Sequence, residues 1–123
     1  MPISQNQMHT VLTELGCRTN FSIKKITEYM LPDSKEAFYM FVENDAAQLI
    51  IRPAYELFLS DLNSIDGVKS KAGYCHYSEM TRFPTRVHKS ANPIHYGIAF
   101  TFKDENAAKR CVEKIIVITQ GHG

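Results

Sequence analysis

The spacing of apolar residues predicts a helix near the start of the chain. Apolar side chains between residues 8 and 15 recur at i, i+3, i+4 and i+7, so they would share one helical face. Ser4 and Gln7 have the spacing of a capping box, in which two backbone N–H groups of the first turn are satisfied by side chains. Gly16 suits the left-handed position at which a helix ends.

Alternation of apolar and polar residues predicts strands after this helix. Residues 17–23 alternate, the period breaks at residues 24–25, and residues 26–31 resume it. Such a break indicates a bulge or a turn. Residues 37–42 and 48–52 predict two more strands, and the short connections between these segments favour an antiparallel meander.

The second half of the chain has a weaker pattern. Four apolar residues between 55 and 65 would share one helical face, and residues 74–77 predict a single strand within a mostly polar stretch. Residues 95–102 alternate as a longer strand. Asp104 would cap a last helix, whose apolar stripe lies within residues 108–116.

The order of these elements predicts the fold class. Neither repeats nor linkers interrupt the chain, so we expect a single domain over residues 1–123, with flexible ends at 1–3 and 120–123. The fold would be α+β, with a largely antiparallel sheet of about four to five strands and the N- and C-terminal helices packed on one face.

Composition is that of an ordinary globular protein. Apolar residues make up 44% of the chain and charged residues 22%, which argues against a disordered chain. No apolar run has the length of a membrane span, and the first residues lack the basic region and apolar core of a secretion signal. We therefore expect a cytoplasmic protein with no membrane partner, either a monomer or a homodimer.

Cysteine and histidine spacing gives no sign of a metal site. Three cysteines are an odd number without Cys-x-x-Cys spacing, which argues against a disulfide framework. A metal site would have to draw on Cys75, His76, His88 and His95, and these residues lack the short paired spacings of zinc ligands. We therefore predict no metal and no cofactor.

Positive charge gathers in residues 68–99, although the whole chain carries only +1. This segment contains five cationic residues and one acidic residue, Glu79, so its net charge is +4. The cations are Lys69, Lys71, Arg82, Arg86 and Lys89. Aromatic residues are interleaved with them, as in surfaces that neutralise phosphates and stack on bases.

The same segment holds two His-Tyr pairs, His76-Tyr77 and His95-Tyr96. Two imidazoles near an arginine would suit a metal-independent hydrolase or ribonuclease. Adjacent residues of a strand point to opposite faces, so His95 and Tyr96 would not share a pocket. His76 and His95 are therefore weak catalytic candidates, and we interpret the chain first as a protein without enzymatic activity.

The function that we favour from the sequence is that of a binding or interaction domain. Its surface would be residues 69–97, engaging an anionic ligand or an acidic protein partner. The predicted binding residues are Tyr77, Arg82, Phe83, Arg86, His95 and Tyr96. Arginines would supply forked donors and the rings a rigid contact area. The alternative is a protein that binds single-stranded nucleic acid, although the chain has no recognised nucleic-acid motif.

Three local features beside this surface predict how it is built. Gly97, inside a strand pattern, predicts the close approach of another backbone. Phe83 and Pro84 predict a packing corner. Arg52 precedes Pro53 at the end of a strand and would reach the rim of the basic segment.

Several short motifs resemble a small bacterial family. They are the run over residues 49–53, His76-Tyr77, Arg82-Phe83-Pro84, His95-Tyr96-Gly97-Ile98 and a capped terminal helix. Members of this family are single-domain cytoplasmic proteins, and the domain has no assigned function. The resemblance spans roughly residues 8–117 and implies an α+β fold and a stand-alone cytoplasmic domain. It implies no activity, cofactor or catalytic residue.

Overall fold

The computed structural model of the chain describes most of its residues. The described ranges are residues 3–23, 25–32, 36–44, 46–71, 73–87 and 92–121. His88 and Lys89, which the sequence places in the basic segment, lie outside these ranges. Within them, the structure contains no helix whose length and hydropathy would suffice to cross a membrane.

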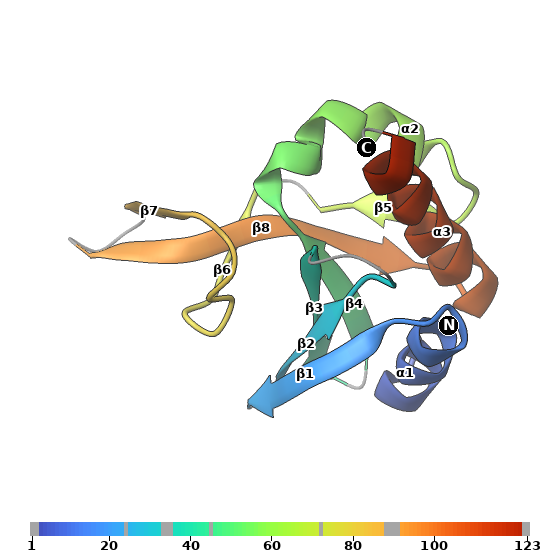
Figure 1. Ribbon diagram of the computed structural model, residues 1–123, viewed down its shortest axis with the longest axis horizontal. Helices are drawn as coiled ribbons and strands as arrows, with labels where there is room; N and C mark the ends of the chain where they lie inside the picture. The colour runs from blue at the N-terminus through green and yellow to red at the C-terminus, as the bar shows by residue number, and fades with distance from the viewer. Residues whose placement is uncertain are drawn as a thin grey trace.

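The described elements are a helix, a strand meander, a short helical segment, further strands and a last helix (Figure 1). The first half holds α1 (Gln5–Glu14), β1 (Arg18–Ile23), β2 (Ile26–Met30), β3 (Ala37–Glu43) and β4 (Ala46–Ile51). The second half holds the 3-10 helix η1 (Pro53–Phe58), α2 (Leu59–Asn63), β5 (Val68–Ser70), β6 (Cys75–His76), β7 (Thr85–Val87), β8 (Pro93–Phe102) and α3 (Glu105–Gly121).

Helix α1 begins and ends as the sequence predicts. The Ser4 hydroxyl accepts the Gln7 N–H at 3.2 Å, and the Gln7 side-chain oxygen accepts the Ser4 N–H at 2.9 Å, which is the predicted capping box. Gly16 has a φ of +90° just after the helix. Ile3 is buried, and its carbonyl accepts the Ala47 N–H at 2.7 Å, so it belongs to the core rather than to a flexible end.

The predicted antiparallel sheet is confirmed, and it is larger than expected. Its strand order is β1-β2-β3-β4-β8-β5, with β6 and β7 also paired to β8. Every pairing among these described strands is antiparallel, and β1 to β4 form the predicted meander. Strands β5 and β7, which the sequence did not predict, have only three residues each, too few for alternation to reveal them. Strand β6 lies within the strand predicted over residues 74–77.

Strand β8 has partners along both of its edges. The carbonyls of His95 and Ala99 accept hydrogen bonds from the N–H groups of Tyr77 and Lys71, on the edge that faces β5 and β6. The Tyr96 N–H points to the opposite edge and donates to the carbonyl of the residue before β7, at 3.1 Å. Strands β4 and β7 therefore follow one another along the same edge of β8.

Helices α1 and α3 lie side by side against one face of the sheet, as predicted (Figure 1). Leu12 of α1 and Val112 of α3 belong to the same buried cluster as Met40 of β3 and Phe100 of β8. Asp104 caps α3 as expected, because its carboxylate accepts the backbone N–H three residues further on at 2.8 Å. This cluster is the main core of the domain.

The opposite face of the sheet carries a second, smaller buried cluster. Tyr39 of β3, Ile50 of β4 and Ala99 of β8 form its base. The segment between β6 and β7 covers them with Met80 and Phe83, which are 0% and 3% exposed. A segment that the sequence presents as polar loop is therefore fixed to the sheet by two apolar side chains.

Gly97 confirms the predicted close approach of another backbone. A Cβ atom at this position would lie 2.7 Å from the Ile51 carbonyl oxygen and 2.8 Å from Cε2 of Phe83. No side chain fits there, so β4 and the Phe83 ring can pack directly against β8.

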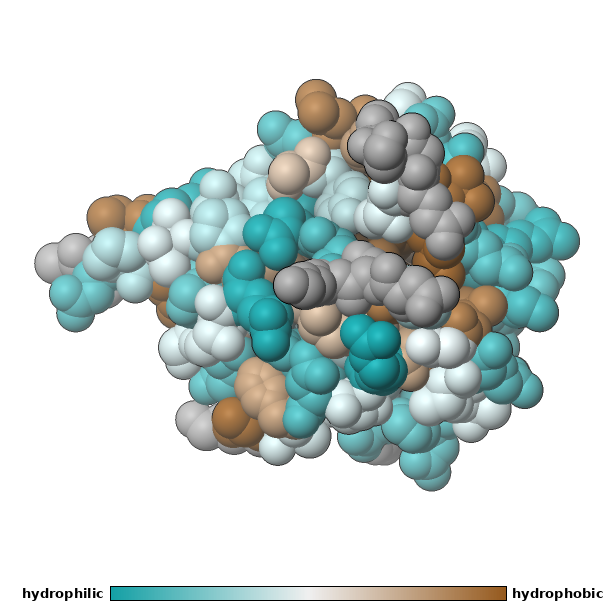
Figure 2. Space-filling view, viewed as in Figure 1, coloured by the Kyte–Doolittle hydropathy of each residue, from teal (hydrophilic) through white to brown (hydrophobic). Residues whose placement is uncertain are grey.

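The outer part of β8, paired with β7, projects from the body of the domain (Figures 1 and 2). Val87 on this arm is 66% exposed. The apolar surface near the tip of the arm is visible in Figure 2.

Candidate functional site

An open groove lies where the neighbour of β8 changes from β4 to β7. Strand β4 ends at Ile51 and β7 begins at Thr85, and Tyr96 of β8 lines the groove between them. Pro53 and Pro84 also line it. Because proline has no N–H, this interruption of the sheet leaves fewer backbone donors without a partner.

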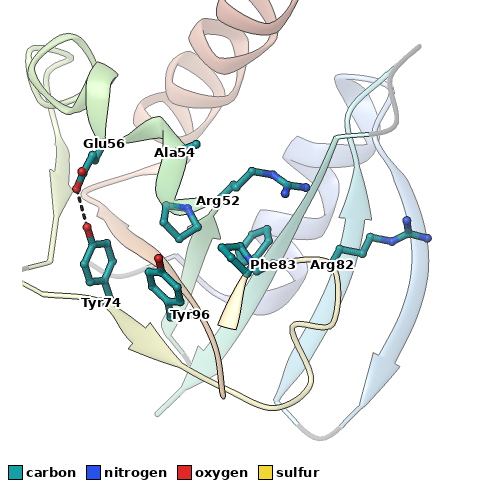
Figure 3. A pocket seen from close by; sticks show the side chains of 9 residues that line it. Arg52, Ala54, Glu56, Tyr74, Arg82, Phe83 and Tyr96 are labelled. Carbon is teal, nitrogen blue, oxygen red and sulfur yellow. Dashed lines mark hydrogen bonds between the residues drawn. The ribbon is translucent and has the colours of Figure 1, made fainter. Parts of the chain in front are cut away.

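The groove has a volume of about 620 Å³ and is open to solvent. Beside the two prolines, its walls are made mainly by Arg52, Arg82, Glu56, Tyr74, Phe83 and Tyr96. Figure 3 shows Glu56 and Tyr74 at one end, Arg82 at the other, and the rings of Tyr96 and Phe83 between them. The groove therefore has an acidic end, an aromatic middle and a cationic end.

A buried carboxylate holds Arg82 at the cationic end. The Arg82 Nε–H donates to Glu28 at 2.9 Å, and Glu28 is only 3% exposed. The Tyr39 hydroxyl donates to the same carboxylate at 2.6 Å, and the Asn20 amide donates at 2.7 Å. The Arg82 backbone N–H in turn donates to the Tyr39 hydroxyl at 3.1 Å. Backbone and side chain of Arg82 are thus both tied to the face of the sheet.

These contacts keep Glu28 ionised. Burial by itself raises the pKa of Glu28, but hydrogen bonds from Tyr39, Asn20 and Arg82, together with the charge of Arg82, outweigh it and hold the pKa below its usual value. The Arg82 side chain remains 52% exposed although its Nε is committed to Glu28. Its terminal nitrogens are therefore the donors that a ligand could reach.

Arg52 also forms an ion pair with a carboxylate of the domain. Its Nε–H donates to Glu36 at 2.8 Å, and its side chain is 34% exposed. The guanidinium carbon lies 5.8 Å from the centre of the Phe83 ring. The sequence prediction that Arg52 reaches the rim of the basic segment is confirmed, because Arg52 and Arg82 line the same groove.

The Phe83 ring lines the middle of the groove. It packs edge-on against the Tyr39 ring with the centroids 4.9 Å apart, as the predicted packing corner requires. Phe83 thus belongs to the second cluster and also lines the groove.

Tyr96 lies in a cluster of aromatic rings around Arg86. Its ring meets the Tyr74 ring edge-on at 5.1 Å, and the Arg86 guanidinium carbon lies 4.7 Å from the Tyr74 ring and 4.9 Å from the Tyr96 ring. The Arg86 Nε–H donates to Nε2 of His76 at 2.9 Å. Only an imidazole with a free lone pair can accept, so this contact requires His76 to be neutral.

Glu56 marks the acidic end of the groove. It is exposed on η1, and its carboxylate accepts the Tyr74 hydroxyl at 2.6 Å. This hydrogen bond, followed by burial and the charge of Glu56, raises the pKa of Tyr74. The tyrosine therefore remains a donor at neutral pH and orients the carboxylate beside the groove.

His76 and His95 are placed on opposite faces of the sheet. His76 pairs directly with Tyr96 in the ladder, and their rings lie 6.1 Å apart, so the adjacent His95 points the other way. Nδ1 of His95 lies 2.7 Å from the Phe83 carbonyl. This arrangement gives no geometric support to a concerted pair of imidazoles.

Of the six predicted binding residues, four line the groove or pack against a residue that lines it, and two lie elsewhere. Arg82, Phe83 and Tyr96 line the groove, and the Arg86 guanidinium packs against the ring of Tyr96. The Tyr77 ring instead packs 4.7 Å from that of Phe41, beside a separate apolar cavity of about 210 Å³. Tyr77 and His95 are therefore not part of the groove.

Neither the cysteines nor the acids form a site for a metal among the described residues. No group of three or more His, Cys, Asp or Glu side chains that could hold an ion occurs there. Burial raises the pKa of Cys75, raises that of Cys17 to about 11 and raises that of Cys111 to about 12. These thiols are therefore poor nucleophiles at neutral pH.

Three acids that define the groove were missed by the sequence prediction. In the first half of the chain, Glu28 lies on β2, Glu36 directly before β3, and Glu56 on η1. Of these, only Glu28 gave a signal, as a single charged residue within an apolar strand segment. A charge at such a position needs a partner, and the partner proves to be Arg82.

Comparisons with known protein families, with curated proteins and with solved structures found no match for this chain. The resemblance to a small bacterial family therefore stays a prediction.

Proposed function

We propose that this protein is a binding domain that recognises an anionic group in the groove between β4 and β7. The group would be carried by a small ligand or by an acidic segment of a protein partner. Arg52 and Arg82 would contact it, with Phe83 and Tyr96 as the adjoining aromatic surface.

The observation that supports this proposal is the way in which the two arginines are oriented. Each uses its Nε–H on a carboxylate of the domain, at 2.8 Å for Arg52 and 2.9 Å for Arg82. Both residues nevertheless line the groove, and both side chains remain partly exposed. A fixed guanidinium loses less conformational entropy on binding than a free one, so such arginines are suited to hold a carboxylate or phosphate.

The pairing also weakens the case for single-stranded nucleic acid. The sequence shows an excess of cations in residues 68–99, but Glu28 neutralises Arg82, and Glu36 neutralises the neighbouring Arg52. Affinity for a polyanion depends on many cations that are free to neutralise phosphates. A ligand with one or two anionic groups fits the groove better.

The proposal can be tested by NMR titration of the isotopically labelled protein with citrate and with inorganic phosphate. We expect the shifts to cluster at the backbone amides of Ala54, Phe83 and Tyr96. Arg52→Gln should weaken binding by about tenfold, the effect of losing one charge-assisted hydrogen bond. Arg52 is chosen because its removal leaves the buried Glu28–Arg82 pair intact.

Arg110→Gln is the matched control, since Arg110 is exposed on α3 and does not line the groove. It should bind both anions like the unmodified protein. If the groove amides do not respond to either anion, or if both substitutions weaken binding equally, the proposal is wrong.

A further inference from the structure

The groove is lined by charges of both signs, and the positive and negative charges lie apart from one another. Arg82 and the Glu56–Tyr74 pair stand at opposite ends in Figure 3. Together with Arg52, the groove residues include two cations and one acid, and each cation already has a carboxylate partner outside the groove lining. The groove thus presents a dipole to its ligand.

A purely anionic ligand would satisfy only one end of this dipole. Placed along the whole groove, its second anionic group would meet the Glu56 carboxylate, and like charges at close range are unfavourable. A ligand with a carboxylate at one end and a cation or N–H donors at the other satisfies both ends. Glu56 retains acceptor capacity for such donors beside its bond with Tyr74.

The middle of the groove favours an apolar side chain between these charged groups. Phe83, Tyr96, Pro53 and Pro84 present rings there. Prolines and aromatic rings provide apolar surface with little freedom to lose on binding. An extended peptide supplies this order of groups, with a basic residue, an apolar residue and a terminal carboxylate.

We propose that the ligand is a carboxylate-terminated peptide with a basic residue near its C-terminus, with its carboxylate at Arg52 and Arg82 and its cation at Glu56. This inference rests on the proposed function of the groove and specifies the ligand class.

The test is a set of calorimetric titrations with acetyl-Lys-Leu-Ala carrying a free carboxylate. One analogue ends in an amide, and another has norleucine in place of lysine. We expect the amide to bind at least about tenfold more weakly, because a charge-assisted contact is lost. The norleucine analogue should bind about two- to fivefold more weakly, because Glu56 is exposed and its attraction is screened by solvent.

A double-mutant cycle assigns the cationic end to Glu56. Glu56→Gln keeps an acceptor for Tyr74 and removes the charge, so the difference between the lysine and norleucine peptides should disappear in this variant. Glu113→Gln, at an exposed position of α3, is the matched control and should retain the difference. Loss of the difference in both variants would overturn the assignment.

The remaining outcomes separate this inference from the proposed function. Equal binding of the lysine and norleucine peptides, with the carboxylate still required, overturns the peptide dipole and leaves anion recognition intact. Loss of all binding to citrate, phosphate and peptides overturns both. Tighter binding of free lysine than of the peptide would also overturn the peptide assignment. So would tighter, strongly salt-dependent binding of mixed-sequence single-stranded DNA.

Discussion

Removal of the Tyr39 hydroxyl should destabilise the domain more than an ordinary Tyr→Phe change. This hydroxyl donates to the buried Glu28 carboxylate at 2.6 Å and accepts the Arg82 N–H at 3.1 Å. Tyr39→Phe keeps the ring and its contact with Phe83, so the change isolates the two hydrogen bonds. Of its donors among the described residues, the carboxylate would keep Asn20 and Arg82.

The magnitude follows from the two bonds. A hydrogen bond to a charged group contributes about 1.5–3 kcal/mol, and a neutral one about 0.5–1.5 kcal/mol. Because the carboxylate is buried and the Arg82 N–H is partly buried, water replaces these partners poorly. We expect a loss of about 2–4 kcal/mol in the free energy of unfolding at pH 7.

The effect should depend on pH with a definite sign. The folded-state pKa of Glu28 lies below its usual value, so the ionised carboxylate stabilises the fold above the unfolded pKa of about 4.3. This contribution is lost as the pH falls through the folded pKa. The difference between Tyr39→Phe and the unmodified protein should therefore be largest at pH 7 and shrink below about pH 4. Burial, with a smaller effect of Glu28, raises the pKa of Tyr39 to about 12, so the hydroxyl stays protonated throughout.

Urea unfolding followed by circular dichroism at several pH values measures this difference, since the chain has no tryptophan for fluorescence. Tyr77→Phe is the matched control: Tyr77 packs against the same face of the sheet, and its hydroxyl has no hydrogen-bond partner among the described residues. The control should cost little and show no such pH dependence. A loss below about 0.5 kcal/mol for Tyr39→Phe, or one that is the same at pH 3.5 and pH 7, would refute the account of this network.

Three further changes test other parts of the fold. Gly97→Ala should lower the free energy of unfolding, measured in urea, by about 1–3 kcal/mol, because the new Cβ would clash with the Ile51 carbonyl. An unchanged free energy of unfolding would contradict the close approach. Ser4→Ala should cost about 1 kcal/mol through loss of the capping box, and no shift of the urea midpoint would argue against it. Cys111, whose pKa burial raises to about 12, should react with a thiol reagent at neutral pH only as fast as the domain unfolds, and rapid labelling of the native protein would disprove its burial.

The elements with a regular apolar period were predictable from the sequence. The stripes of α1 and α3 and the alternation of β8 each specify one buried face, and the structure buries those faces. Strand β6 lies within the strand predicted over residues 74–77, whereas β5 and β7 were missed because three residues do not establish a period. Their pairing is decided by β8, whose ten residues extend beyond β4 and offer edges to other segments.

The site was predictable only in part, for a related reason. Sequence reasoning found Arg82, Phe83 and Tyr96 because they lie in one segment with an unusual composition. Glu28 and Glu56 come from parts of the chain that are distant in sequence, and only the sheet order brings them near Arg82 and Tyr74. A local charge count therefore misses the pairing of Arg82 with the buried carboxylate of Glu28.

The same topology connects ligand binding with the stability of the second cluster. Phe83 and Arg82 belong to the segment that closes this cluster, and both also line the groove. A ligand that contacts Arg82 on this segment and Tyr96 on β8 must favour the state in which the segment is closed, because the groove exists only in that state. The Glu28 network favours the same state without a ligand. The proposed anion and the buried carboxylate would therefore stabilise the same conformation of Arg82, the anion from the solvent side and Glu28 from the face of the sheet.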